Sequence, residues 1–203
     1  MPRILLVDNY DSFTYNLVHY LEGLDCEVDA VYNDKLDLSK VSNYDKVVLS
    51  PGPGLPNQAG LMPMLIREFY DSIPILGVCL GFQAIVEFFG GSLFNQEYVK
   101  HGVAENALFD ENSKLFKNTA PKFKVGLYHS WAANPSNFPE SLTITGKTEA
   151  GTIMAFEHQS LPIAGVQFHP ESILSRHGKK IVENFIFSFN LNNLPLNHKS
   201  ITQ

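Results

Sequence analysis

The chain has 203 residues, 44% hydrophobic and 12% aromatic, which suit one compact domain with a sizeable core. Its net charge of -6 argues against nucleic-acid binding, because phosphate recognition needs clustered lysine and arginine. No apolar stretch approaches the roughly 20 residues that span a membrane, and the start lacks a signal-peptide pattern. Two cysteines are too few for a disulfide scaffold. We therefore expect a soluble, cytoplasmic protein with free thiols.

The first half of the chain alternates short apolar runs with helical patterns. ILLVD at 4–8 predicts a buried strand, and the segment that follows has apolar residues at helical spacing, namely Phe13, Leu17, Leu21 and Leu24. The alternation returns in CEVDAVY, KVVLS, LMPMLIREFYD, and PILGVC followed by LGFQAIVEFFGG. Apolar strands separated by helices indicate an α/β fold, with a mostly parallel central sheet covered by helices on both faces.

From about Ser92 the pattern changes to β-rich segments. FKVGLYHSW, SLTITGKTE, TIMAFEHQ and IAGVQFH predict antiparallel additions to the sheet in the second half of the chain. A last helix, GKKIVENFIFSFN, has Ile181, Phe185 and Phe189 on one stripe. We expect one domain over residues 1–190 and a polar C-terminal tail over 191–203.

Cys79 lies at a predicted junction between a buried strand and a helix, flanked by Gly77 and Gly81. A turn tight enough to expose a nucleophile needs neighbours without Cβ atoms, as in the nucleophile elbow, here with sulfur in place of oxygen. The start of the helix at Leu80 also favours the thiolate. Free cysteines are nevertheless among the most buried residues. This stretch alone fits a nucleophile and a core thiol equally well.

A cysteine nucleophile needs a base, and the segment GVQFHPES offers one with a partner. His169 ends an apolar strand, and in an extended chain Glu171, two residues on, projects to the same side. By analogy with triad geometry, His169 would exchange the thiol proton and Glu171 would orient the imidazole. Taken singly, each residue is better explained by a structural role, as a satisfied strand-end histidine and a solvated carboxylate.

The segment VVLSPGPG carries a strand into a loop that alternates proline with glycine. In a parallel sheet this loop lies at the same carboxyl edge as Cys79, where α/β folds bind their ligands. An oxyanion hole needs the N–H of the residue after the nucleophile, Leu80, and a second N–H from a neighbouring loop, for which Gly52 is well placed. An ordinary tight turn has the same composition.

Taken together, PGPG, GVCLGFQ, YHSW and GVQFHPES resemble, in the right order, the signature blocks of the class I glutamine amidotransferases. The opening LLVDNYDSFTYNLVHYL further resembles the branch that serves chorismate. This branch contains the small, glutaminase subunits of anthranilate synthase and 4-amino-4-deoxychorismate synthase. The resemblance extends to about Asn190.

The resemblance implies a flavodoxin-like fold and a glutaminase with a Cys79–His169–Glu171 triad and a glutamyl thioester intermediate. It implies Gly52 and Leu80 as oxyanion donors, and it places the substrate L-glutamine against Gly52, Pro53, Gly54, Leu80, Gln83, Ser130 and Trp131. The ammonia would pass to a separate, chorismate-binding synthase subunit. We expect no cofactor. Because the histidines are scattered without metal-ligand spacing, we also expect no metal.

Three features depart from the family pattern. Phe82 stands where the family commonly has His, Trp131 where it has Leu, and the segment 103–105 where it has hydroxyl-rich residues, which leaves the details of partner coupling open. We expect Tyr128 and His129 to be structural.

Two alternative functions remain at this stage. A stand-alone γ-glutamyl thiol hydrolase would keep the triad and need no partner. A non-catalytic, flavodoxin-like binding module would share the α/β alternation, although the sequence lacks a glycine-rich phosphate loop.

Overall fold

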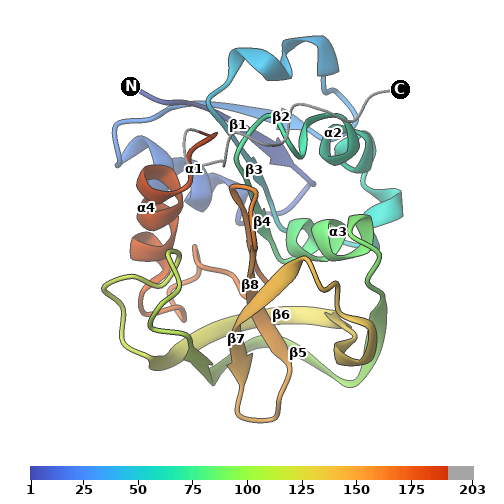
Figure 1. Cartoon of the computed structure of the whole chain (residues 1–203), viewed down its shortest axis with the longest axis vertical. Helices are drawn as coiled ribbons and strands as arrows, with labels where there is room; N and C mark the ends of the chain where they lie inside the picture. The colour runs from blue at the N-terminus through green and yellow to red at the C-terminus, as the bar shows by residue number, and fades with distance from the viewer. Residues whose placement is uncertain (192–203) are drawn as a thin grey trace.

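The computed structural model describes residues 1–191, except for the side chains of residues 97–100. From residue 192 on, the predicted tail lies outside the described residues. Nine strands form one sheet in the order β2-β1-β3-β4-β9-β8-β7-β5-β6. Helices pack on both faces of this sheet (Figure 1).

Five strands form the parallel half of the sheet. They are β1 (Arg3–Asp8), β2 (Glu27–Tyr32), β3 (Lys46–Leu49), β4 (Ile75–Val78) and β9 (Ile163–Val166). Each neighbouring pair among them is parallel, so their carboxyl ends meet at one edge. The order is that of doubly wound folds, which bind ligands at this edge. The predicted parallel sheet is confirmed.

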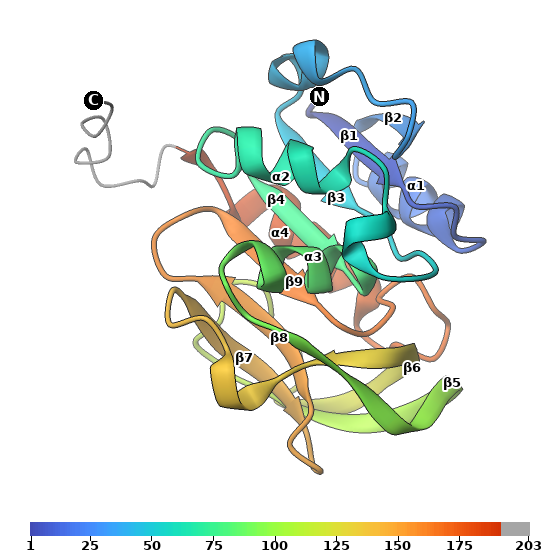
Figure 2. The ribbon, with the colours of Figure 1, turned by 90° about the vertical axis from the view of Figure 1, so that its right-hand side faces the viewer.

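The other four strands form the antiparallel half, which curves away from the parallel strands (Figure 2). They are β5 (Leu93–Phe109), β6 (Lys122–Ala133), β7 (Leu142–Thr148) and β8 (Ile153–His158). Antiparallel additions were expected, and β6, β7 and β8 are such strands.

The prediction was wrong for the strand in IAGVQFH, because β9 pairs in parallel with β4 while it runs antiparallel to β8. A short apolar strand does not reveal its direction. The sequence analysis also missed β5, which mixes polar and apolar residues without clear alternation and shifts its register with β6 around Gly102, a residue with a positive φ.

The helices cover the sheet in two pairs, with α1 (Thr14–Glu22) and α4 (Gly178–Ser188) on one face and α2 (Met62–Phe69) and α3 (Leu80–Phe88) on the other (Figure 1). Alternating residues of β1 supply both cores: Ile4 and Leu6 pack toward α1 and α4, and Leu5 and Val7 toward α2 and α3. Within the described residues, no helix is both long and apolar enough to cross a membrane.

Phe82, one of the departures from the family pattern, belongs to the core. Its side chain is fully buried on α3, and its ring centroid lies 5.0 Å from that of Phe156 on β8. The aromatic side chain therefore packs α3 against the sheet, three residues after Cys79.

We expect Phe82→Ala to lower the free energy of unfolding by about 3–5 kcal/mol, because a large buried ring leaves a cavity. Urea denaturation of the purified variant measures this loss. Phe187→Ala is the matched control, since Phe187 is 58% exposed on α4. Equal losses in the two variants would contradict the core role of Phe82.

Candidate active site

Cys79 turns the chain between β4 and α3, with a φ of 51° that is unusual for a residue other than glycine. Gly77 and Gly81, each two residues from Cys79, permit this turn because they lack side chains. A Cβ at Gly77 would lie 2.5 Å from the Gly81 carbonyl oxygen, and a Cβ at Gly81 would lie 2.7 Å from that of Leu49. The Cys79 N–H donates to the Val166 carbonyl on β9 at 2.8 Å. Strands on both sides therefore fix the turn.

His169 and Glu171 follow β9, and the structure brings them together. The distance from His169 Nδ1 to Glu171 Oε1 is 2.6 Å, and both side chains are buried. Because a carboxylate only accepts hydrogen bonds, Nδ1 is the donor. Within the described residues His169 Nε2 meets no partner at strict hydrogen-bond geometry, although the Cys79 sulfur lies near enough to influence the charge of the ring.

The charge of His169 is set by opposing effects. Burial disfavours the imidazolium, but the adjacent Cys79 sulfur and Glu171 carboxylate outweigh it and raise the pKa of His169 to about 11. The two anionic neighbours therefore favour the protonated ring, which can act as an acid beside the Cys79 sulfur.

Two aromatic rings enclose the imidazole. The ring of Tyr128 on β6 lies 4.7 Å from that of His169, and the ring of Phe13 lies 6.0 Å away. The Tyr128 hydroxyl is 3.0 Å from Ser172 Oγ. Tyr128 was expected to be structural, yet it lies against the site, where its ring can stabilise a cationic imidazole. His129 is buried, with Nδ1 2.9 Å from the Trp131 carbonyl.

A chain of amides links β6 to the sulfur. Gln83 on α3 donates from Nε2 to the Trp131 carbonyl at 2.9 Å and to Gln167 Oε1 at 3.2 Å. Gln167, fully buried after β9, places its own Nε2 3.7 Å from Cys79 Sγ. Ser130 and Trp131 are thus held beside the helix that follows Cys79. Sequence reasoning missed Gln167, whose only signal was an amide inside an apolar strand.

The loop after β3 meets the start of α3. A Cβ at Gly52 would lie 2.9 Å from Leu80 Cδ2, so the loop packs directly on the first residue of the helix. In the described part of the chain, neither the Gly52 nor the Leu80 N–H donates to another residue. Gly54 has a φ of 78°, and both it and Pro53 are exposed. Leu80 directly follows Cys79, so both of these N–H groups belong to residues at the Cys79 turn or in contact with it.

Asn9, which the sequence analysis missed, ties the loop after β1 to the loop after β3. Its backbone N–H donates to Ser50 Oγ at 2.9 Å and its Nδ2 to the Ser50 carbonyl at 2.8 Å, and both residues are buried. A Cβ at Gly52 would also lie 2.6 Å from the Asn9 carbonyl oxygen. Asn9 therefore fixes the position of the loop that carries Gly52.

Among the described residues, Asp11, His169 and Glu171 form a group whose donor atoms lie within 4.8 Å of one another, close enough to hold a metal ion. The 2.6 Å between Nδ1 and Oε1 is a direct hydrogen bond, however, and two donors each about 2.0–2.1 Å from one zinc ion stand farther apart. The geometry of His169 and Glu171 is that of a directly hydrogen-bonded pair, not of two ligands of one metal ion.

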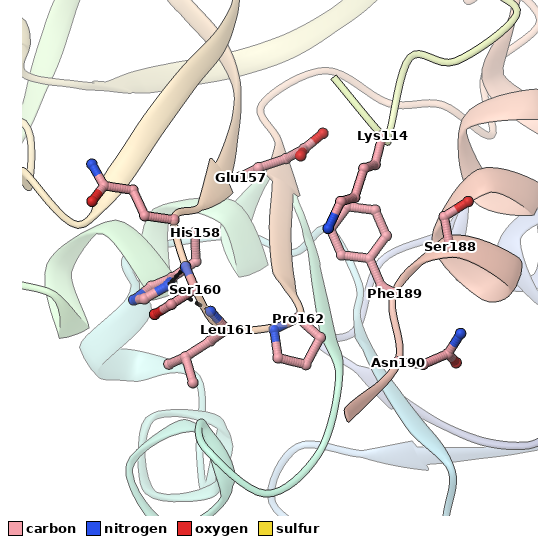
Figure 3. A pocket seen from close by; sticks show the side chains of 10 residues that line it. Lys114, Glu157, His158, Ser160, Leu161, Pro162, Ser188, Phe189 and Asn190 are labelled. Carbon is pink, nitrogen blue, oxygen red and sulfur yellow. Dashed lines mark hydrogen bonds between the residues drawn. The ribbon is translucent and has the colours of Figure 1, made fainter. Parts of the chain in front are cut away.

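A separate small pocket lies between the β8–β9 connection and the end of α4 (Figure 3). Lys114, Pro162 and Phe189 are among its lining residues, and the His158 imidazole accepts from the backbone of the connection. Its volume of about 40 Å³ holds only a few water molecules. It lies at the amino end of β9, whereas His169 follows the carboxyl end, so it is no part of the candidate site.

Residues 5–189 match the family model described as glutamine amidotransferase class-I. The chain belongs to the class I glutamine amidotransferase family, as its sequence motifs predicted. The fold is shared with a Thermoplasma acidophilum protein that bears the name of a putative GMP synthase subunit, with a TM-score of 0.83, 27% identity and 92% of each chain covered.

Within the family, the chain is similar to proteins that carry the name of a synthase component 2. It is 45% identical to anthranilate synthase component 2 of Azospirillum brasilense, over 90% of this chain and 94% of that protein. It is 41% identical to aminodeoxychorismate/anthranilate synthase component 2 of Bacillus subtilis, over 92% of this chain and 96% of that protein.

We expect Glu171→Gln to lower the pKa of His169, because the substitution removes one of the two charges that stabilise the imidazolium. An NMR titration of protein with labelled histidine measures the change. Glu183→Gln is the control, since Glu183 pairs with Lys180 on α4 and leaves His169 untouched. An unchanged His169 titration in folded Glu171→Gln would contradict the assigned electrostatics.

Proposed function

We propose that this chain is the glutaminase subunit of a chorismate-aminating synthase. It hydrolyses L-glutamine with a Cys79–His169–Glu171 triad and delivers the ammonia to a chorismate-binding synthase subunit. The observation that carries the proposal is a cysteine on a strained strand-to-helix turn that interacts with a buried His–Glu pair. The names of the relatives support the branch, and the family match over residues 5–189 supports one amidotransferase domain over residues 1–190.

In the first half of the reaction, the Cys79 thiolate attacks the side-chain amide carbon of glutamine. A sulfur–carbon bond forms, and the carbonyl electron pair moves to oxygen, which accepts hydrogen bonds from the N–H groups of Gly52 and Leu80. The His169 imidazolium then protonates the amide nitrogen. The carbon–nitrogen bond breaks, ammonia leaves, and a glutamyl thioester remains.

In the second half, neutral His169 accepts a proton from water, and the resulting hydroxide attacks the thioester carbon. The same two N–H groups hold the second oxyanion. The carbon–sulfur bond breaks, which releases glutamate and restores the thiolate and the imidazolium. Throughout, Glu171 keeps the proton on Nδ1, so that Nε2 performs both transfers.

Substrate glutamine would lie over the junction where the loop after β3 meets the start of α3. Gly52 and Gly54 carry no side chain, Pro53 and Gly54 are exposed, and Ser130 and Trp131 would contact the other side of the substrate. The Gln83 amide nitrogen already donates to Trp131 and Gln167. The Gln83 carbonyl oxygen is therefore the end that would accept a hydrogen bond from substrate.

Because the ammonia has to be passed to a synthase subunit, we expect the activity of the site to depend on that partner. Catalytic groups come from separate loops at one sheet edge, and a small shift in any of them would misplace a donor or the base. A synthase subunit that docks across this edge would align them and receive the ammonia. The two free, buried thiols, Cys26 and Cys79, suit the reducing conditions of the cytoplasm.

The function is tested by Cys79→Ser in the complex with a chorismate-binding synthase subunit. We expect glutamine-dependent amination to fall about 10³-fold or more, because the serine hydroxyl is a far weaker nucleophile. Amination from added ammonium salts should remain largely intact, since ammonia then bypasses the glutaminase site. Product formation from each nitrogen source is measured. Equal loss of both activities in an assembled complex would contradict the proposal.

We also expect the isolated chain to be a poor glutaminase that becomes active when it binds its chorismate-aminating partner. Glutamate release is measured for the chain alone, with that partner, and with the synthase portion of a purine-pathway amidotransferase as control. Stimulation by the first partner alone supports the branch. Full activity without a partner would favour a stand-alone hydrolase, and no activity under any condition would favour a non-catalytic module.

A further inference from the structure

Gln167 is a fully buried amide whose nitrogen contacts the candidate nucleophile. Its Nε2 lies 3.7 Å from Cys79 Sγ, and its Oε1 accepts from Gln83 Nε2 at 3.2 Å. We propose that Gln167 is a positioning residue for Cys79, whose amide N–H holds the sulfur in place and favours the thiolate. This inference rests on the proposed function, in which Cys79 is the nucleophile.

The orientation of the Gln167 amide follows from its neighbours. The Trp131 carbonyl only accepts hydrogen bonds, so the NH₂ end of Gln83 must face it. The same NH₂ group meets Gln167, which must therefore present its oxygen to Gln83. The remaining NH₂ end of Gln167 then faces Cys79. The Trp131 carbonyl on β6 thus orients Gln83, which in turn orients Gln167 so that its N–H points at the sulfur.

The position of Gln167 in the sheet explains why it reaches Cys79. Val78 on β4 pairs with Val166 on β9, so the next residue of each strand lies at the same level. His169 follows two residues later on the same segment. One short stretch after β9 therefore supplies both the donor and the acid–base group that act on the sulfur.

A buried glutamine is costly unless its polar atoms are paired. Its neighbours Val166 and Phe168 are buried and apolar, so an apolar side chain would suit a purely structural role at this position. An N–H donor stabilises an anionic sulfur more than a neutral thiol, because hydrogen bonds to charged acceptors are stronger. The amide therefore shifts the balance toward the reactive form.

The test measures Cys79 itself, without glutamine or a partner. The full chain is alkylated with iodoacetamide from pH 5 to pH 10, and the modified Cys79 peptide is followed by mass spectrometry. We expect Gln167→Leu to move the midpoint of the pH profile upward, which on the acid side of the midpoint lowers the alkylated fraction about three- to tenfold. Gln167→Glu should move it further, because a carboxylate beside the sulfur repels the thiolate.

Two controls separate this effect from general damage. Gln159→Leu removes an exposed glutamine that bonds the Glu140 carbonyl, and its profile should match that of the unsubstituted chain. Cys26, the second buried thiol, reports in every sample on any loosening of the fold. Gln167→Glu keeps an acceptor for Gln83, so it should fold even if the leucine variant does not.

An unchanged midpoint in either folded Gln167 variant, or a downward shift, would overturn the inference. Its failure is distinct from failure of the proposed function. If Cys79→Ser retains glutaminase activity while the Gln167 variants shift the midpoint, the proposed reaction is wrong and the contact stands. If Cys79→Ser abolishes glutaminase activity but the Gln167 profiles do not move, only the role of Gln167 falls.

Discussion

The close approach of α3 to β3 and β4 is the constraint on which the candidate site depends. Gly81 lies so near Leu49 that no Cβ fits between them, and Gly77 lies equally near Gly81. The helix must therefore begin directly after the strand, and Cys79 alone turns the chain, at a positive φ. Such a conformation costs on the order of 1–3 kcal/mol and persists because packed strands on both sides impose it.

Once the turn is fixed, the parallel strands assemble the rest of the site. The segments after β1, β3, β4 and β9 all emerge at the same edge and carry Asn9, Gly52, Cys79 and His169, respectively. The antiparallel half contributes through β6, whose Trp131 carbonyl holds Gln83. The sheet therefore gathers residues that are far apart in the sequence, and buried hydrogen bonds set their final positions.

Much of this arrangement could be predicted because its signals are local. Glycines on both sides of Cys79 indicated the turn, and the two-residue spacing of His169 and Glu171 indicated their convergence. The direction of β9, the existence of β5 and the contacts of Gln167 and Tyr128 depend on pairing between distant segments. The residue pattern of one strand does not indicate which strands lie beside it, so these features could be identified only from the structure.

The most direct test of the account is to identify the residue that carries the acyl intermediate. The chain, with its synthase partner, is mixed with L-glutamine, quenched in acid during turnover, and digested for peptide mass spectrometry. Acid preserves a thioester, so the account predicts a glutamyl group on the peptide that contains Cys79 and on no other. Turnover with the glutamyl group on another residue, such as Cys26, would contradict it.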